Sequence, residues 1–462
     1  MHEDWLGNVE QHIAVQIART ITAPSNRPIW FDAFLVGVGA LIVFAATAQY
    51  HDPLNNDTRA SAIAAWQLAH HGNATLDAFY PHYAWIFESH GRYVTNRLPG
   101  TVFWATPFYA LLGGSDYPAV YPGALAAAVA SALAVGLVFV LACRLVSRRA
   151  AAVSALLLAF ATGTWTVSAD QLWTHGPGQA AVLLMVLLAT KERWLLAGVP
   201  AGFAILVRPH LGVVAVVLCA FGVARTRKAR PLLMAIGCAA GAAILLAYNQ
   251  ALWGKWAIFG GYDQPVAASG HKFVAGLTGL AGDFVSPERG LFVLTPLLLL
   301  LVPGLRRAWR VAPDWVRAAT VAGVAYLALQ LWGIRFTGGD GFYSYRTTLE
   351  SLTLTTPLLV LAWREWTAVT RARRATFAGL AVVSVALHAF GAVINWVPSG
   401  INLPPWRTFM PIDLARHIGI AQTTGWLAAT LIALGTAIVL TLRPKNSVSA
   451  RPTGSPEKVA LA

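Results

Sequence analysis

The apolar run IWFDAFLVGVGALIVFAATAQ at residues 29–49 leads directly into YHDPLNNDTRASAIAAWQLAHHGNATLD at residues 50–77. The first stretch is long enough to cross a bilayer as a helix, which takes about 20 apolar residues. The second stretch places carboxylates and histidines at the end of that helix. A membrane span that opens into titratable groups predicts that the chemistry of this chain lies at one face of a membrane.

The composition of the whole chain agrees with a membrane protein. Of its 462 residues, 56% are hydrophobic and only 12% are charged, whereas soluble domains carry about 25% charged residues. Apolar runs recur along nearly the whole length, which indicates helices rather than a membrane barrel. We therefore predict an all-α polytopic membrane protein. The net charge of +14 comes from Lys and Arg in loops, as topology requires, so it does not predict nucleic-acid binding.

The apolar runs predict about twelve transmembrane helices. They lie near residues 29–49, 119–143, 150–167, 177–190, 194–207, 210–224, 231–249, 290–304, 317–333, 349–363, 376–396 and 421–441. With this arrangement most of the Lys and Arg residues fall on one side. We expect that side to be the cytoplasmic side of the cell membrane, with both termini inside and the active site on the outer (periplasmic) face.

The same arrangement divides the chain into four parts. They are a cytoplasmic N-terminal segment at 1–28, a seven-span module at 29–289 with outer loops at 50–118 and 250–289, a five-span module at 290–442, and a disordered cytoplasmic tail at 443–462. The division requires that the apolar stretch at 99–114 does not cross the membrane. Because that stretch is short and holds two prolines, we expect an interfacial helix in the first outer loop.

A second helix is predicted in the first outer loop, over residues 56–72. Asn56 or Asp57 would be its N-cap and Gly72 its C-terminal stop, with Trp66 and Leu68 facing the membrane.

Two carboxylates in this region have both a plain and a functional interpretation. Asp57 could only cap the helix, and Asp52 could only solvate the turn before Pro53. The functional alternative is a general base that deprotonates an acceptor hydroxyl, with its pKa raised towards neutrality by an apolar wall.

Isolated arginines on the expected outer face are candidates for binding phosphate, because the planar guanidinium matches it bidentately. Arg208 in LVRPHLG is the most informative, since it lies between two short spans. It could instead snorkel to the interface or pair with Asp170.

The remaining candidates are weaker. His175 in WTHGPG could orient a phosphate or a sugar, or could simply cap a helix, and His388 is interpreted as a core residue. No phosphate loop, zinc motif or cysteine pair is present. The sequence therefore requires no cofactor, and it leaves a divalent cation open.

Several motifs carry a resemblance to a known family. NNDTRASAIAAWQLAHHGNATLD and RLPGTVFWATPFYALLG, within the layout of spans and outer loops over about residues 30–350, resemble the GT-C superfamily of polyprenyl-phosphate-dependent membrane glycosyltransferases. SADQLWTHGPG, SPERGLFVLTPLLL and WGIRFTGGDGFYSYR are similar to segments of its bacterial members. In those members Gly-Pro precedes the final Arg. Here Ser344-Tyr345 precedes Arg346, and a single Asp57, with Asp52 five residues earlier, replaces an adjacent acidic pair.

The resemblance implies a GT-C fold and an inverting transfer of a sugar from a polyprenyl-phosphate donor to an envelope glycan, lipid or protein. It places Asp57 at the catalytic acidic position and leaves open whether Asp52 is the base instead. The residues that it implies for the donor phosphate are Arg59, Arg97, Arg208 and Arg346, and those for the substrate are His175, Asp263, Arg289, Asp340 and Tyr343.

The identity of the donor sugar rests on composition alone. Many Ala residues and more Arg than Lys are typical of a high-GC genome such as that of an actinobacterium, which favours an arabinose or mannose donor. The alternatives to an enzyme are a transporter or flippase of a lipid-linked saccharide, which should show inverted repeats, and a non-catalytic scaffold of an envelope-building complex.

Overall fold

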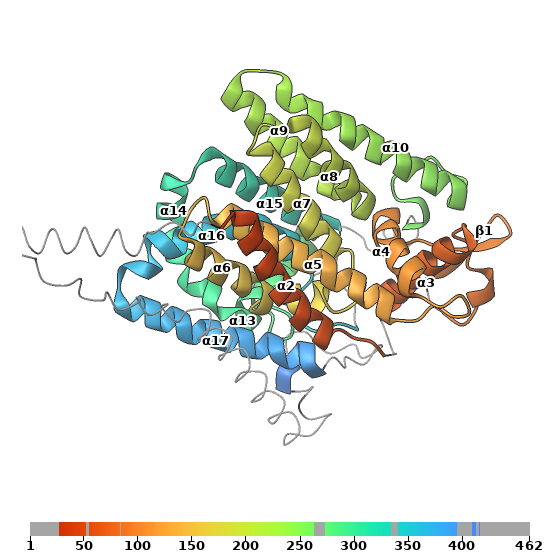
Figure 1. Ribbon diagram of the computed structural model, residues 1–462, viewed down its shortest axis with the longest axis horizontal. Helices are drawn as coiled ribbons and strands as arrows, with labels where there is room; N and C mark the ends of the chain where they lie inside the picture. Colours follow the sequence, from red (N-terminus) through yellow and green to blue (C-terminus); the bar gives the residue numbers. More distant parts are fainter. Residues whose placement is uncertain are drawn as a thin grey trace, which may run out of the picture.

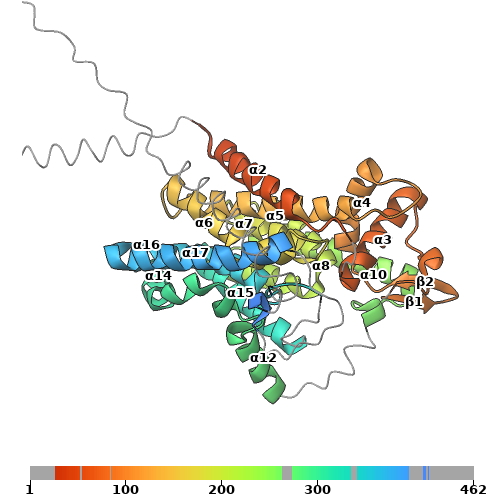
Figure 2. The same ribbon diagram turned by 90° about the horizontal axis from the view of Figure 1, so that it is seen from below.

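The computed structural model describes residues 27–51, 55–83, 85–262, 273–333, 341–394, 409–412 and 415. Helices dominate these residues, and Figures 1 and 2 show most of them stacked side by side into one bundle. At one end of the bundle, in both views, lie helix α3 and the hairpin of strands β1 and β2, and at the other end lies α14.

The first part of the bundle follows the predicted spans closely. Its helices are α2 (Ile29–Thr47), α5 (Tyr121–Ala142), α6 (Arg148–Phe160), α7 (His175–Ala189), α8 (Trp194–Val207), α9 (Gly212–Thr226) and α10 (Met234–Trp253). Short 3-10 turns precede α9 and α10, and a π-helical turn at Thr164–Ser168 follows α6. Five segments of the described chain are long and apolar enough to cross a membrane: Ile29–Thr47, Tyr121–Ala142, Pro209–Thr226, Arg230–Trp253 and Arg371–Ile394.

The second part contains α12 (Phe273–Val285), α13 (Leu291–Leu294), α14 (Leu305–Val311), α15 (Asp314–Gly333), α16 (Leu349–Glu365) and α17 (Arg371–Ile394). The predicted single span at 290–304 is wrong. The chain there forms α13 and two 3-10 turns, Pro296–Leu300 and Val302–Gly304. Both turns carry a proline near their start, and a proline cannot donate the backbone hydrogen bond that would continue an α-helix. The predicted span at 421–441 lies outside the described residues.

The helix predicted in the first outer loop is present as α3 (Asn56–His71). Gly72 ends it in the left-handed conformation at φ +66°, as expected. The predicted N-cap is wrong: Asn55, not Asn56 or Asp57, caps the helix, because its side chain accepts a hydrogen bond from the Asp57 backbone N–H. Trp66 does not face the membrane, since it is 5% exposed and its indole N–H donates to the Gly114 carbonyl.

The stretch at 99–114 forms helix α4 (Pro99–Leu112), which packs against α3, α5 and α8. Its placement at the membrane interface stays a prediction. Between α3 and α4 lies an element that the all-α prediction missed, the antiparallel hairpin of β1 (Ile86–Ser89) and β2 (Arg92–Thr95). His90 and Gly91 turn the hairpin with φ of +49° and +72°, which matches the right-handed twist of paired strands.

The hairpin tip rests on the end of α10. The Nε2 atom of His90 lies 3.3 Å from the carbonyl oxygen of Trp253. The ring of Phe87 packs near the same tryptophan, with 6.2 Å between ring centroids. The hairpin therefore packs against the helix bundle through side chains. Among the described residues its sheet has two strands.

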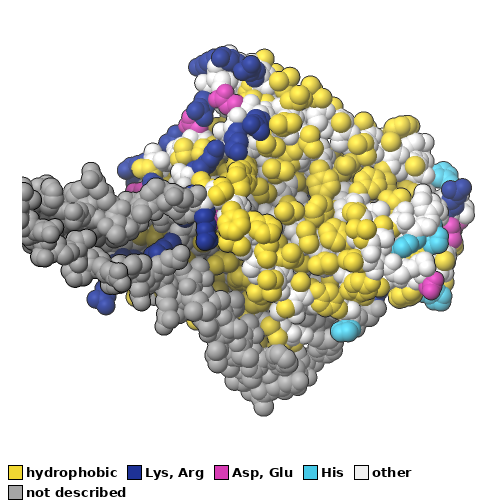
Figure 3. Space-filling model, viewed as in Figure 1, with side chains coloured by type: hydrophobic (Ala, Val, Ile, Leu, Met, Phe, Trp, Pro, Cys, Tyr) yellow, Lys and Arg dark blue, Asp and Glu magenta, His cyan; other side chains and the backbone are white. Residues whose placement is uncertain are grey.

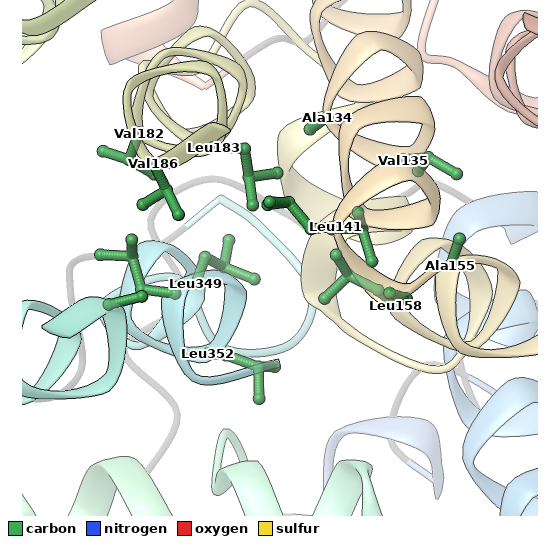
Figure 4. Packing of buried hydrophobic residues seen from close by; sticks show 14 of the residues in the cluster. Ala134, Val135, Leu141, Ala155, Leu158, Val182, Leu183, Val186, Leu349 and Leu352 are labelled. Carbon is green, nitrogen blue, oxygen red and sulfur yellow. The ribbon is translucent and has the colours of Figure 1, made fainter. Parts of the chain in front are cut away.

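The core lies between α5, α6, α7 and α16. Figure 4 shows Leu141 of α5 and Leu158 of α6 close together, with Leu183 of α7 and Leu349 of α16 beside them. Alanines fill much of α5, so that neighbouring helices approach closely. Small residues at such contacts are typical of helix pairs within membranes.

Helices α8 and α10 approach each other closely. Gly198 and Gly202 of α8 face Gly237 and Gly241 of α10, and a Cβ atom added to Gly241 would lie 2.6 Å from the Cα atom of Gly202. The two backbones are therefore in direct contact, as only glycine allows.

Charge and apolar surface are separated on the face shown in Figure 3. Lys and Arg gather at one end, among them the exposed residues Arg225, Arg227, Lys228 and Arg230 between α9 and α10. Histidines gather at the other end, near α3 and the hairpin, whereas acidic side chains are visible at both ends. An apolar belt of hydrophobic side chains covers the surface between the two ends. Exposed apolar residues of α8 and of the chain around the start of α10 include Leu195, Val199, Leu233 and Ile236. Such a belt between polar ends is what a bilayer requires.

Candidate functional site

The start of α3 is held against the helix bundle through Gln171. The Oε1 atom of Gln171 accepts hydrogen bonds from the hydroxyl of Thr58, at 2.7 Å, and from the backbone N–H of Asn55, at 3.2 Å. Asp57 lies between these two residues, in the first turn of the helix. The unpaired backbone N–H groups of a helix N-terminus favour a negative charge at that position.

Asp57 bridges two arginines that come from distant parts of the chain. Its Oδ1 atom lies 2.8 Å from Nη1 of Arg97, and its Oδ2 atom lies 3.2 Å from Nη1 of Arg346. The Asp57 side chain remains 23% exposed. A substrate can therefore reach this carboxylate, and both of its oxygens already have a cationic partner.

These cations correct one expectation about Asp57. Burial alone would raise the pKa of its carboxyl group, as the apolar-wall hypothesis assumed. The charges of Arg97 and Arg346 outweigh that effect and hold the pKa below its ordinary value. At neutral pH Asp57 is therefore an ionised carboxylate whose basicity the two arginines reduce.

Arg97 follows β2 and is fixed by its neighbour. The Oδ1 atom of Asn96 accepts from both Nε and Nη2 of Arg97, at 3.0 and 2.7 Å. The guanidinium also lies over the ring of Trp85, 5.3 Å from its centroid. Asn96 and Arg97 are 3% and 8% exposed. Asn96 thus directs the remaining nitrogen of Arg97, Nη1, at Asp57.

Arg346 is held mainly by aromatic rings. Its guanidinium lies over Trp173 at 4.7 Å and over Phe342 at 5.0 Å from the ring centroids. The Arg346 side chain makes one hydrogen bond to a described residue. Its Nη1 donates to Asp57. Within the described chain, the Nε and Nη2 groups of Arg346 are therefore not engaged by hydrogen bonds.

The backbone before Arg346 is unusual. Gly341 has φ +71°, and Ser344 has φ +78° although it is not glycine and is fully buried. Residues other than glycine rarely adopt such angles, and they cluster at functional sites. On the other side of the segment, a Cβ atom on Gly163 would lie 2.7 Å from the Tyr345 carbonyl oxygen. The absence of a side chain at Gly163 lets the segment reach Asp57.

Arg208, at the C-terminal end of α8, contacts a second group of polar residues. Its Nε donates to Thr174, its Nη1 donates to Tyr326, and its Nη2 lies 3.2 Å from His175 Nε2. Glu350 lies 3.7 Å from Nη1 of the arginine and 3.0 Å from the other nitrogen of His175. Every nitrogen of Arg208 therefore has a protein partner. Its charge still acts on Asp57 and helps to lower the pKa of that carboxyl group.

His175, predicted to bind substrate, is fully buried in this network. It lies between Glu350 and Arg208 and is within hydrogen-bond distance of both.

Arg289 follows α12 in the sequence and also contacts Phe342. Its guanidinium is 4.3 Å from the Phe342 ring centroid, and its Nε lies 2.8 Å from Oε1 of Glu288. Arg289 and Arg346 thus contact the same ring. Asp283 is also near, because its Oδ1 atom accepts from the hydroxyl of Thr347. Burial raises the pKa of Asp283 to about 7.

Two predicted residues have their described contacts away from this cluster. The guanidinium of Arg59 lies over the ring of Tyr83, 5.4 Å from its centroid. Tyr343 points to α17, where its hydroxyl donates to the Leu387 carbonyl and its ring packs on Phe390. His388 is a satisfied core residue as expected, with Thr295 3.1 Å from its Nε2.

The predicted site residues Asp52, Asp263 and Asp340 lie outside the described residues. Among the residues that the structure does describe, no three His, Cys, Asp or Glu side chains are grouped so that they could hold a metal ion.

Sequence reasoning missed the residues that support the arginines. Asn96 precedes Arg97 directly, and an amide next to a buried arginine is the signal that could have identified it. Trp85, Trp173 and Phe342 stack on the arginines through contacts across the chain. The motifs QLWTHGPG and GDGFYSYR contain two of these rings, yet nothing in their spacing reveals the pairing.

Comparisons with known proteins find structural neighbours only. No family model matches the sequence, and no curated protein matches it. Among solved structures, ArnT from Cupriavidus metallidurans in the apo state is similar over 88% of this chain and 76% of its own, with 17% identity and a TM-score of 0.47.

The oligosaccharyltransferase of Archaeoglobus fulgidus in the apo form is similar over 84% of this chain and 59% of its own, with 13% identity and a TM-score of 0.48. The same archaeal oligosaccharyltransferase, AglB, in complex with an inhibitory peptide and a dolichol-phosphate, aligns with 14% identity and a TM-score of 0.41. The present chain thus spans less than two thirds of the length of the archaeal protein.

Proposed function

We propose that this chain is an integral membrane glycosyltransferase that transfers a sugar from a polyprenyl-phosphate donor to an acceptor hydroxyl on the outer face of the cell membrane. The observation that carries the proposal is the position of Asp57. This partly exposed carboxylate lies between Arg97 and Arg346, at the end of the apolar belt where α3 and the hairpin gather. The motifs shared with the GT-C superfamily support the same role.

The proposed reaction needs a base and an anion site next to each other. Asp57 takes the proton from the acceptor hydroxyl, and the acceptor oxygen attacks the anomeric carbon of the donor sugar from the face opposite the phosphate. The bond between that carbon and the phosphate oxygen breaks, and its electron pair leaves with the polyprenyl phosphate. One displacement inverts the configuration at the anomeric carbon. The phosphate is a good leaving group, so the step needs no acid to protonate it.

The arginines would bind the donor phosphate and stabilise its negative charge. Arg346 has N–H groups that no described residue uses, and Arg97 is aimed by Asn96 at the same point. Arg208 and Arg289 add positive potential from behind. Guanidinium groups in a partly buried site stabilise phosphate charge strongly. We propose an arabinose or mannose type of sugar, and an envelope glycan, lipid or protein as the acceptor.

Two experiments test this function. Mass spectrometry of lipid that co-purifies with the protein should find a polyprenyl-phosphate sugar, which would identify the donor. In proteoliposomes supplied with that donor and an acceptor, Asp57→Asn should insert and fold normally yet transfer no sugar, whereas Asp116→Asn, a matched change at an exposed carboxylate bonded to Ser115, should remain active. Full activity of Asp57→Asn would rule out the base, and uptake of a lipid-linked saccharide without any acceptor would indicate a transporter instead.

A further inference from the structure

The contacts of Asp57 oppose its use as a general base. Both of its oxygens face guanidinium nitrogens, at 2.8 Å and 3.2 Å. A carboxylate in such a double ion pair binds a proton weakly. Arg346, whose Nε and Nη2 groups no described residue uses, is also the group that would hold the donor phosphate, so the base and the phosphate require the same partner.

The two arginines are anchored differently. Arg97 is tied to Asn96 by two hydrogen bonds and lies over Trp85. Arg346 has the longer contact with Asp57, and its other described contacts are the faces of Trp173 and Phe342. The ring faces attract the charge of the guanidinium as a whole, so they do not fix the direction of individual N–H groups as the two hydrogen bonds of Arg97 do. Arg346 is therefore the partner that can move.

We propose that the donor phosphate and Asp57 compete for Arg346, so that binding of the donor takes Arg346 from Asp57 and leaves the carboxylate able to act as a base. This inference rests on the proposed function, because it assigns an order of events to the same site. Arg97 stays on Asp57 and keeps it in place. The base becomes effective only when a donor is present.

The surroundings of Arg346 favour such an exchange. Arg208 and Arg289 are close enough to repel its charge, and Arg289 lies over the same Phe342 ring. Asp57 is the one carboxylate of the described chain that is paired directly with Arg346. Within the described residues Asp57 pairs directly with Arg97 and Arg346, whereas a phosphate would bring a larger negative charge into the same group of cations.

The exchange predicts an outcome that a base alone does not. Removing the competing carboxylate should strengthen phosphate binding, although it abolishes transfer. We expect Asp57→Asn to bind a short-chain prenyl monophosphate about tenfold more tightly than the wild type. This factor corresponds to a gain of about 1.4 kcal/mol in binding free energy, because the carboxylate no longer competes for Arg346. Isothermal titration calorimetry of the detergent-solubilised full chain measures this. Asp116→Asn removes a carboxylate elsewhere in the first outer loop and should leave the affinity unchanged.

A double-mutant cycle separates competition from simple repulsion between two anions. Arg346→Gln should weaken binding. In the Arg346→Gln background, Asp57→Asn should no longer strengthen it, because the contested partner is gone. If the gain from Asp57→Asn persists there in full, or if Asp57→Asn binds no more tightly than the wild type, the exchange is wrong.

Failure of the proposed function gives a different result. If the wild type binds the prenyl monophosphate no more tightly than inorganic phosphate, the site does not select a lipid-linked phosphate, and the proposed donor is wrong. Inorganic phosphate still tests the exchange in that case, since the competition for Arg346 concerns the phosphate group alone. A tighter complex of Asp57→Asn with inorganic phosphate would support the exchange even without a lipid ligand.

Discussion

Arg346 places its Nη1 atom 3.2 Å from Oδ2 of Asp57, although 289 residues of sequence separate the two. Asp57 begins a helix of the first outer loop, and Arg346 precedes α16 in the second half of the chain. The ion pair therefore joins the two halves at the candidate site.

Asn96 should act as a positioning residue for Arg97. In Asn96→Ala the arginine loses the acceptor of two side-chain hydrogen bonds, so its Nη1 is no longer directed at Asp57. Small losses of alignment cost large factors in rate, and we expect a fall of about tenfold in kcat/KM for the donor. The matched variant Asn73→Ala, at an exposed asparagine after α3, should keep the wild-type value. Equal values for both variants would show that Arg97 does not depend on Asn96.

Gly100 should fix the distance between two arginine-bearing segments. A Cβ atom there would lie 2.6 Å from the carbonyl carbon of Leu206 and would also overlap the backbone nitrogen of Val207. Because backbone cannot move aside, Gly100→Ala should push α4 away from the end of α8 and lower the free energy of unfolding by about 1–3 kcal/mol. Gly114→Ala, where no atom lies within 4 Å, is the control. Thermal unfolding in detergent compares the two, and a shift no larger than that of the control would contradict the close approach.

Asp283 should make stability depend on pH. Burial raises its pKa in the folded protein from an ordinary 3.8 to about 7, so the folded state binds the proton more tightly than the unfolded state does. The stabilising effect is complete below about pH 4 and is lost as pH rises to about 7. Asp283→Asn cannot ionise, so its unfolding midpoint, measured across this range, should fall less with rising pH than that of the wild type. Parallel curves for the two proteins would contradict the raised pKa.

Glu350 should be needed for the fold more than any exposed carboxylate on the same helix. It is fully buried and contacts His175 and Arg208. Breaking a buried pair leaves the other charge without compensation, which costs about 3–5 kcal/mol. Glu350→Gln should therefore unfold at a clearly lower temperature. Glu365→Gln removes a partly exposed pair with Arg364 and should change the midpoint little, as surface pairs contribute about 0–1 kcal/mol.

The sequence predicted most helices of the bundle, because each is an uninterrupted apolar run. The prediction was wrong where a tertiary contact determines the position or orientation of a residue. Asn55, Asn56 and Asp57 are all good N-caps, and only the bond from Asn55 to Gln171 selects the first. The sequence predicts that Trp66 faces the membrane, but its indole N–H donates to the Gly114 carbonyl inside the protein. The β1–β2 hairpin was missed between two longer helices.

The candidate site divides in the same way. Motif resemblance named Asp57, Arg97 and Arg346, and the structure brings these three together. Resemblance also named Tyr343, whose hydroxyl donates to the Leu387 carbonyl of α17. The lowered pKa of Asp57 could not be foreseen, since it depends on charges that come from the far side of the chain.

The glycine contact between α8 and α10 has a consequence for how the site keeps its shape. Arg208 stands at the end of α8, and the hairpin that leads to Arg97 rests on Trp253 at the end of α10. Because the two helices touch through main chain at Gly202 and Gly241, no side-chain rotation can change their spacing. The α8–α10 pair is therefore a rigid unit that keeps a constant distance between the end of α8, which carries Arg208, and the end of α10, which supports the hairpin before Arg97.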